Sequence, residues 1–211
     1  MSGDSQRVIY PAQLRRSAEY NDLLMEDTTY LTGQLLIAMP SMMDPNFYRT
    51  VTYVCEHNEH GALGLVINRP LDFDLVEVFD QLSLTKTDDE LANTPILRGG
   101  PVELERGFVI HDSAAEWEST TSVGDAIQVT TSQDILSAMA AGNGPKRAIV
   151  VLGYAGWGAG QLENEIVENA WLSAPGSPHI VFDTPYEQRW EEAAGLLGVD
   201  LATMSTDAGH A

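Results

Sequence analysis

Residues 148–162 read AIVVLGYAGWGAGQL, an apolar run that leads into four glycines before a helix-like stretch resumes. A strand, a glycine turn and a helix are the frame of a phosphate-binding loop, because backbone N–H groups and the positive end of a helix attract anions. The details do not fit that use. The glycines lack the G-x-G-x-x-G spacing of a dinucleotide site, and no lysine follows them as a P-loop requires.

The glycine segment therefore has a structural interpretation. Glu163 and Glu165 fall in the first turns of the helix predicted after it, where carboxylates already complement the helix dipole and disfavour a bound anion. We expect the glycines to permit tight turns and close backbone packing around Tyr154 and Trp157. The alternative is a pocket for a neutral or cationic ligand, walled by these two aromatic side chains.

Length and composition indicate an ordinary globular protein. The chain has 211 residues, of which 44% are hydrophobic and 20% charged, and this length predicts one domain with a full core. No apolar run approaches the ~20 residues that span a bilayer, and the first residues lack the apolar segment of a secretory signal. The single cysteine, Cys55, permits no intramolecular disulfide. We expect a cytoplasmic protein that does not act at a membrane.

The net charge bears on the possible partners. The chain carries 31 acidic and 11 basic residues, which gives a formal charge of −20. Proteins draw most of their affinity for duplex DNA from Lys and Arg that neutralise phosphates, so this composition disfavours direct DNA binding. The pattern also contains no helix-turn-helix with a basic recognition helix.

Periodicity and turn residues predict a mixture of strands and helices. Residues 1–28 are polar and weakly periodic, and we expect an extension or a loosely docked helix there, ahead of a domain of residues 29–211. Apolar runs and alternation predict strands at residues 33–39, 49–56, 62–68, 125–131, 148–152 and 179–183, and two more within 95–112. Helical spacing predicts helices at residues 72–82, 131–142 and 184–198.

Capping residues support the three predicted helix starts. Asp72 or Asp74 caps the first helix, Thr131 caps the second and Thr184 caps the third. Strands and helices are mixed without regular alternation. The predicted fold class is therefore an irregular α/β or α+β domain rather than a doubly wound sheet.

No short motif identifies a reaction, a metal or a cofactor. Cys55, His57 and His60 lie within six residues and could contribute to a transition-metal site, but a fourth ligand and a second metal-binding motif are missing. A polar hairpin loop beside a core cysteine is the simpler interpretation. His111, Asp112 and Ser113 are triad residue types, yet neighbours in sequence rarely face one another, and no G-x-S-x-G turn occurs. We therefore predict no metal and no cofactor.

Four longer stretches resemble the AlgH/YqgE family of bacterial proteins, both in their residues and in their order along the chain. These are residues 33–70, 98–112, 130–172 and 208–211, so that the resemblance covers about residues 30–211. It implies a single domain in which a mixed, bifurcated sheet forms a pseudo-barrel flanked by helices. It also implies a cytoplasmic protein whose biochemical role is not established, although some members carry the label of transcriptional regulator.

Two functions follow as hypotheses. The first is a regulatory or ligand-sensing protein that affects gene expression indirectly, through a small molecule or a protein partner. The second is an enzyme with an unclassified site that acts on a small anionic molecule. His57, Arg106 and His111 would carry that site, because His exchanges protons near neutral pH and Arg anchors carboxylate or phosphate. Convergence of these side chains in one pocket would favour the enzyme.

Polar residues within the family-like stretches define one candidate ligand site. Each stands at or near a predicted strand end or turn, where binding groups concentrate on a rigid scaffold. An arginine beside histidines would create a local positive spot able to attract an anionic small molecule. The alternative is that the arginines pair with carboxylates and the histidines cap strand ends. The candidates are His57, Asn58, Asn68, Arg69, Arg106, His111 and Trp157.

Overall fold

The computed structural model describes residues 30–85, 95–124, 126–199 and 201. The chain divides at Tyr30, and every described helix and strand belongs to the unit Leu31–Ala211. The extension predicted at residues 1–28 lies outside the described residues. No described helix combines the length and the apolar character needed to cross a membrane.

The described part contains ten strands, four α-helices and one π-helical segment. The strands are β1 (Gln34–Ala38), β2 (Val51–Asn58), β3 (Gly61–Val66), β4 (Pro70–Asp74), β5 (Pro95–Arg98), β6 (Val102–His111), β7 (Thr120–Val123), β8 (Ile127–Thr130), β9 (Ala148–Gly158) and β10 (Trp171–Pro175). The helices are α2 (Leu75–Gln81), α4 (Asp134–Ala140), α5 (Gln161–Val167), η1 (His179–Asp183) and α6 (Arg189–Gly195).

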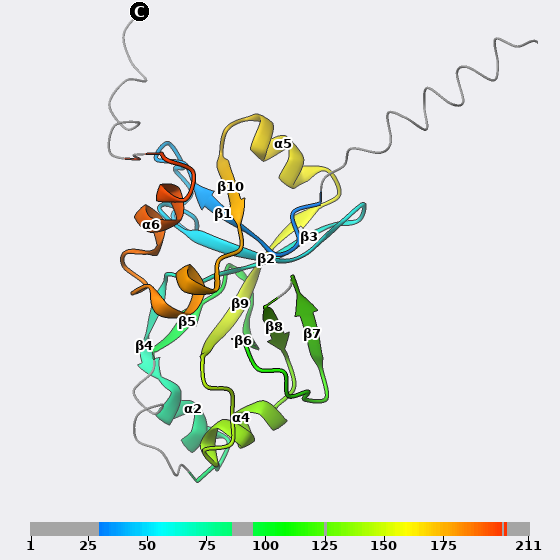
Figure 1. Ribbon diagram of the computed structural model, residues 1–211, viewed down its shortest axis with the longest axis vertical. Coiled ribbons are helices and arrows are strands. Elements are labelled where there is room, and N and C mark those ends of the chain that lie inside the picture. Colours follow the sequence, from blue (N-terminus) through cyan, green and yellow to red (C-terminus); the bar gives the residue numbers. More distant parts are fainter. Residues whose placement is uncertain (1–29, 86–94, 125, 200, 202–211) are drawn as a thin grey trace, which may run out of the picture. The chain divides into compact units, whose positions relative to one another are not determined.

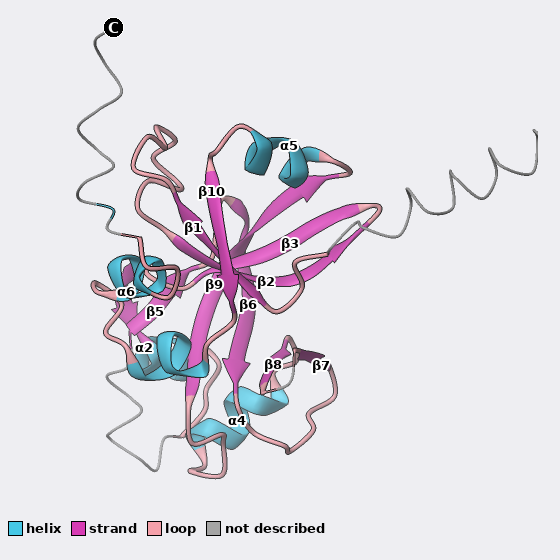
Figure 2. Ribbon diagram, turned by 45° about the horizontal axis from the view of Figure 1, so that its top comes forward, coloured by secondary structure: helices cyan, strands magenta, loops and turns pink. Residues whose placement is uncertain are grey.

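β9 is the strand that both halves of the sheet share. The strands follow the order β10-β1-β2-β3-β9-β6-β8-β7, and β5 joins β9 in parallel while pairing with β4 on its other side. The first half of β9 pairs with β5 and β6, whereas its last residues pair with β3. Figures 1 and 2 show the two groups of strands diverging from this shared strand. The fold is a curled, mainly antiparallel sheet flanked by a few helices, which confirms the predicted mixed fold class and the helix-flanked sheet that the family resemblance implies.

Gly153 lies at the point where β9 passes from one group of strands to the other. It has a φ of 71°, and a Cβ atom there would lie 2.9 Å from the carbonyl oxygen of Gly100. In return, a Cβ on Gly100 would lie 2.2 Å from the carbonyl oxygen of Tyr154. Only glycine tolerates this positive φ without cost and this close approach of two backbones. The expected close packing is therefore confirmed.

The expected glycine turn is wrong, because most of the segment is strand. Gly153, Gly156 and Gly158 all belong to β9, and only Gly160 stands at the start of α5, with a φ of 73°. Tyr154 packs against the main core and Trp157 against another cluster, so these two rings do not wall a common pocket. Odd spacing along a strand places side chains on opposite faces, which explains the separation.

Three apolar clusters fill the faces of the sheet. The largest lies between the sheet and the segment formed by η1 and α6, with Trp190 buried against it. A second, rich in aromatic rings, lies under α5 and contains Trp157 and Trp171. The third lies under α2 and α4 and includes Phe79 and Ile135.

Local capping signals give mixed results. Asp74 caps α2 and accepts N–H bonds from Val76 and Glu77, while the Glu77 carboxylate accepts from the Asp74 N–H, so the prediction of an Asp cap is confirmed. The predicted Thr131 cap is wrong, because α4 begins after Gln133 without a side-chain cap.

The region after residue 178 departs most from prediction. Residues 179–183 form a π-helical turn instead of a strand, because Ile180 and Val181 are both buried in the main core and adjacent strand residues would face opposite sides. The Thr184 cap is also wrong. α6 begins at Arg189, and the Thr184 hydroxyl instead donates to Glu192 at 3.0 Å.

Two matched glycine substitutions test the role of the crossing. Gly153→Ala should lower the free energy of unfolding by about 2–4 kcal/mol, because the methyl group meets backbone atoms that cannot rotate away. Gly160→Ala has nearly the same φ but open space around the new Cβ, so its cost should be only about 1 kcal/mol. Urea unfolding measures both. Equal losses in the two variants would contradict the importance of the close approach.

Candidate functional site

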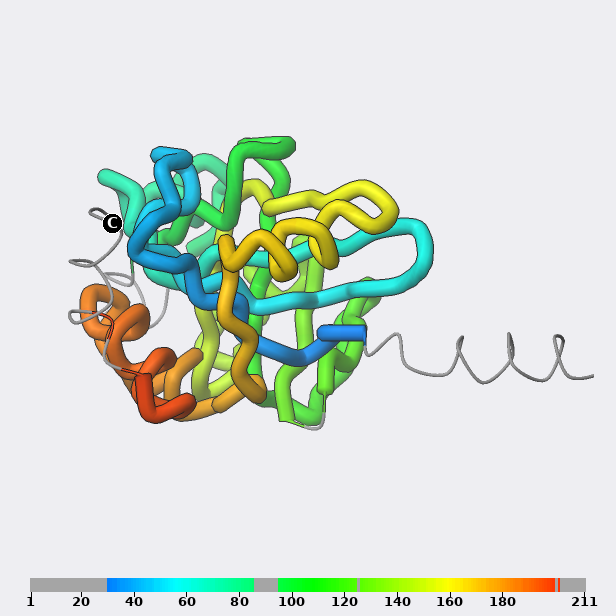
Figure 3. The backbone as a smooth tube through the Cα atoms, turned by 90° about the horizontal axis from the view of Figure 1, so that it is seen from above, coloured from blue at the N-terminus to red at the C-terminus, as the bar shows by residue number. Residues whose placement is uncertain are grey.

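The structure distributes the seven candidate residues over four places. His57, Asn58 and Trp157 lie where the β2–β3 hairpin pairs with the end of β9. Figure 3 shows the course of the backbone through this hairpin and β9. Asn68 and Arg69 lie between β3 and β4. Arg106 lies within β6, and His111 ends that strand.

Strand register shows that the two histidines are far apart. His111 pairs with Ala148 at the first residue of β9, whereas His57 pairs with Ala62, which pairs with Trp157. Nine residues of β9 separate these levels, which is about 30 Å in a straight strand. The grouping of His57, Arg106 and His111 that would favour an enzyme is therefore not formed.

His57 is a buried structural link. Its Nδ1 accepts the N–H of Leu31 at 3.0 Å, and its Nε2 lies 3.0 Å from the Glu163 carboxylate at the start of α5. An Nδ1 that accepts leaves the ring proton on Nε2, which can donate to the carboxylate. The side chain is 2% exposed. Glu163 therefore fixes α5 to the hairpin. The sequence predicts only that this carboxylate complements the dipole of the helix, and not that it binds a histidine.

Trp157 is held in an aromatic cluster by a second carboxylate. One oxygen of Glu165 accepts the indole N–H of Trp157 at 2.8 Å and that of Trp171 at 2.9 Å. The two indole rings meet edge to face, and Phe47 packs on both. Buried indole N–H groups need an acceptor, so Glu165 makes the cluster possible. This arrangement is structural.

The remaining hairpin residues either order the turn or lie apart from one another. Asn58 orders the turn, since its amide donates to Glu56 at 2.7 Å and its oxygen accepts the N–H of His60 at 2.8 Å. His60 is exposed, and burial raises the pKa of the Cys55 thiol to about 12. Among the described residues, no group of three potential ligands is arranged to hold a metal ion.

Arg106 and His111 are both engaged locally. Arg106 pairs with Glu103 at 3.2 Å and stacks over the rings of Phe108 and Tyr154. The His111 ring is fully buried, with Nε2 2.9 Å from the Thr130 hydroxyl and Trp117 edge to face against it. Burial lowers the pKa of His111, although the charge of Asp112 opposes the shift. The ring is therefore kept neutral.

Asn68 and Arg69 are the candidates that act on the same segment. The Asn68 amide donates to the carbonyl of Arg49 at 2.9 Å, and the Arg69 guanidinium donates to the carbonyl of Tyr48. Their role in binding stays a prediction, and Arg49, which the sequence did not single out, joins them.

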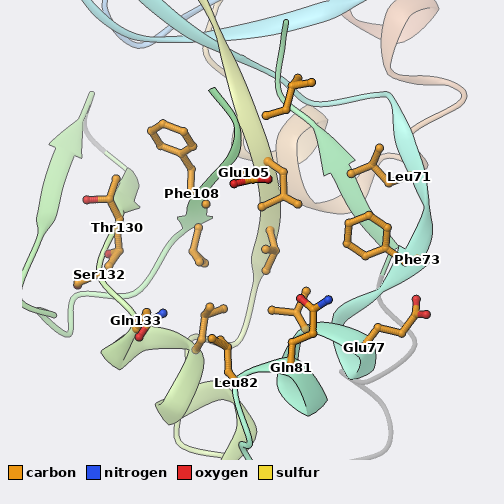
Figure 4. Close-up of a pocket in the computed structure, with 18 of the residues that line it drawn as sticks. Leu71, Phe73, Glu77, Gln81, Leu82, Glu105, Phe108, Thr130, Ser132 and Gln133 are labelled. Atoms are coloured by element: carbon orange, nitrogen blue, oxygen red, sulfur yellow. The ribbon is translucent and has the colours of Figure 1, made fainter. Parts of the chain in front are cut away.

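A cavity of about 880 Å³ opens at a different place, between β4, β6, β9, α2 and α4. None of the seven candidates lines it. Figure 4 shows Leu71 and Phe73 of β4 on one side and Phe108 and Thr130 on the other. The apolar floor comes from Leu71, Phe73, Val78, Leu82, Phe108, Val109, Leu136, Val150 and Leu152. Polar groups come from Glu77, Gln81, Arg98, Glu105, Thr131, Ser132 and Gln133.

Sequence reasoning missed this cavity because its wall is assembled from five separate segments. Strand alternation predicts that Leu71 and Phe73 share a face, but β4 itself was not predicted, since Pro70 and the aspartates are poor strand formers. Gly107 was the available signal. A Cβ there would meet only one side-chain atom, at 3.8 Å, so this glycine leaves space beside Leu152.

The comparisons with known proteins agree with the architecture. The AlgH-like family model matches residues 35–202. The chain belongs to the AlgH-like family. It is 52% identical over 183 residues to a UPF0301 protein of Xanthomonas campestris pv. campestris, covering 87% of this chain and 97% of the relative. A UPF0301 protein of Thioalkalivibrio sulfidiphilus is 53% identical over 187 residues, covering 89% and 100%.

Two solved structures share the AlgH-like fold. The solution structure of the AlgH protein from Pseudomonas aeruginosa superposes with a TM-score of 0.71 at 50% identity, over 89% of this chain and 99% of that one. A crystal structure of a Corynebacterium diphtheriae protein gives a TM-score of 0.65 at 22% identity, over 87% and 96%. The second likeness concerns the fold alone. These relatives support membership of the AlgH-like family, and their names assign no reaction.

Burial of neutral His111 predicts a pH dependence of stability. The unfolded chain takes up a proton on this residue near pH 6.5, whereas the folded chain takes it up only at lower pH. Because the unfolded state then binds more protons, this residue should make the protein less stable as the pH falls from about 6.5. His111→Asn should flatten this part of the stability profile, measured by urea unfolding between pH 4.5 and 8. Parallel profiles for both proteins would contradict it.

Proposed function

We propose that this AlgH-like chain is a ligand-sensing protein whose small-molecule ligand occupies the cavity between β4, β6, β9, α2 and α4, and that it affects gene expression indirectly. The cavity is the observation that carries the proposal. Its volume of about 880 Å³ lies within the ~300–1,000 Å³ typical of ligand pockets. An apolar floor with a few polar groups at its edge is also the usual composition of such pockets.

The cavity lining favours an uncharged or zwitterionic amphipathic ligand. Its charged groups are Glu77 and Glu105, which are acidic, and Arg98. Two carboxylates oppose a purely anionic ligand, so the anionic molecule expected from the sequence does not suit this cavity. Amide and hydroxyl groups from Gln81, Gln133 and Ser132 can orient a ligand by hydrogen bonds.

Ligand sensing is favoured over catalysis by the same lining. No histidine or cysteine lines the cavity within the described part of the chain. His57 and His111 are held elsewhere by Glu163 and Thr130. The net charge of −20 favours a protein partner or a small molecule over DNA as the route to gene expression.

A plug in the cavity tests ligand binding. Gly107→Phe places an aromatic ring beside Leu152, where the added Cβ has room, so the variant should fold and lose ligands. A fragment library screened by ligand-observed NMR should give hits whose affinity falls at least roughly ten-fold in this variant, because a filled pocket removes the contact area. Val167→Phe is the matched control, since Val167 is 80% exposed on α5.

The outcomes separate the possibilities. Hits that survive in Gly107→Phe, or the absence of any hit for the unmodified protein, would contradict the cavity as a ligand site. Transcript profiling tests the regulatory part. Cells carrying Gly107→Phe should show the expression changes of a strain that lacks the protein, and a wild-type profile would contradict regulation through this cavity.

A further inference from the structure

Three arginines gather on one face of the chain, away from the cavity floor. The described residues include seven Lys or Arg side chains. Arg49 precedes β2, Arg69 precedes β4, and Arg189 begins α6. The chain brings them together because α6 packs beside β1 and β2 (Figure 1).

Hydrogen bonds from Asn68 and Arg69 hold the backbone at Arg49 in place. Asn68 bridges the two loops, since its oxygen accepts the N–H of Val51 at 2.9 Å and its amide donates to the carbonyl of Arg49 at 2.9 Å. Arg69 donates to the neighbouring carbonyl of Tyr48. These bonds hold Arg49 at a φ of 53°, a left-handed conformation that costs a non-glycine residue free energy and concentrates at binding sites.

The Arg49 guanidinium is oriented by two rings. Its Cζ lies 5.4 Å from the ring centre of Tyr48 and 5.0 Å from that of Trp190. The Trp190 indole is itself fixed by donating to the carbonyl of Ala38 at 2.8 Å. Aromatic contacts occupy the faces of a guanidinium, whereas its N–H donors lie in the plane. Arg49 therefore presents its donors at the surface in a restricted orientation.

Arg189 supplies a buried positive charge behind this surface. It is 6% exposed, and it donates to the carbonyl of Thr184 at 2.9 Å and to the carbonyl of Ile67. Ile67 directly precedes Asn68 and Arg69 in the sequence, so the charge of Arg189 lies next to the loop that these two residues form. Burial lowers the pKa of Arg189 to about 10, partly opposed by Glu187, and the group stays charged at neutral pH.

None of these three arginines forms a close ion pair with a carboxylate of the described residues, although the charge of Glu187 acts on Arg189 from a longer distance. Within the described part of the chain, neither Arg49, Arg69 nor Arg189 has a carboxylate oxygen within 4.0 Å. Asp44 lies in the same loop but accepts from Asn46 instead.

Other arginines show that this exception is local. Arg106 pairs with Glu103, and Arg147 pairs with Asp112 at 2.8 Å and Asp183 at 3.2 Å. In a chain with 31 acidic and 11 basic residues, partners are abundant. A cluster of like charges without them raises the local potential and suits an anion from solution.

We infer that Arg49 and Arg69, supported by Asn68 and Arg189, form a binding site for a small phosphate monoester. Two exposed or half-exposed guanidinium groups match the charge of a phosphate dianion, and their planar donors suit its oxygens. Malonate carries the same two charges but divides them between two separate carboxylates, so it lacks the single compact group of oxygens that both guanidinium groups can share. The site is separate from the ligand cavity and does not depend on the function proposed for it.

Titrations with inorganic phosphate and with glycerol phosphate test this site. The titrations use the full chain at constant ionic strength. NMR follows the Nε–Hε signals of the arginines and the indole N–H signal of Trp190. Both phosphates should shift the Arg49, Arg69 and Trp190 signals, with malonate as the carboxylate comparison binding roughly ten-fold more weakly. Arg49→Gln and Arg69→Gln should each weaken phosphate binding by roughly ten-fold.

Two further variants make the result decisive. Arg106→Gln is the matched control, because Arg106 is also exposed and stacked on rings but is paired with Glu103, and it should leave phosphate binding unchanged. Arg49→Lys keeps the charge and the fold but loses the planar donors, and it should weaken binding less than Arg49→Gln. Absence of phosphate-induced shifts, equal loss in Arg106→Gln, or equal binding of malonate would overturn the proposal.

Discussion

The close crossing of two backbones, Gly99–Gly100 over Gly153–Tyr154, is the constraint on which the rest of the fold depends. A Cβ on Gly99 would lie 2.2 Å from the carbonyl oxygen of Gly153, so a side chain at the crossing would push the segments apart. The crossing lets β5 run beside the first half of β9 and leaves the last part of β9 to β3. One strand can therefore serve two diverging groups of strands, and both groups contribute side chains to the main core.

Each side of the crossing satisfies its polar groups differently. On the side of α5, two carboxylates of one short helix reach inward, Glu163 to His57 and Glu165 to Trp157 and Trp171. These charge-assisted bonds fix the helix and fill the space beside the aromatic rings. On the side of α2 and α4, the helices pack over the sheet through Phe79 and Ile135 and leave the cavity open. The carboxylate contacts to buried rings therefore lie on one side of the crossing, and the cavity lies on the other.

The sequence predicts the elements whose signals are local and misses what depends on assembly. Asp74 and Glu77 lie three residues apart and form their capping box wherever the helix packs, so that start is predictable. Residues 179–183 carry strand-favouring side chains, but burial of both Ile180 and Val181 selects a helical turn. The bifurcated sheet is predicted from the family resemblance, because hydrophobic periodicity does not show which strands pair.

The candidate site illustrates the same limit. Asn68 and Arg69 stand near a strand end, as predicted. Their role in the proposed site depends on hydrogen bonds to residues 48 and 49, which sequence spacing does not reveal. His57 and His111 have the right chemistry for catalysis, but strand register sends them to opposite ends of β9.

The two proposed sites are joined by the short β4–β5 pair. Arg98, which lines the cavity, donates its N–H to the carbonyl of Arg69 at 2.7 Å. Leu71 and Phe73 of β4 face the cavity, while Arg69 precedes the same strand and holds the Tyr48 carbonyl. Because β5 in turn pairs with β9 beside the glycine crossing, both sites are attached to a strand pair where two backbones lie too close for a side chain to come between them. Their polar groups are therefore carried by a closely packed scaffold.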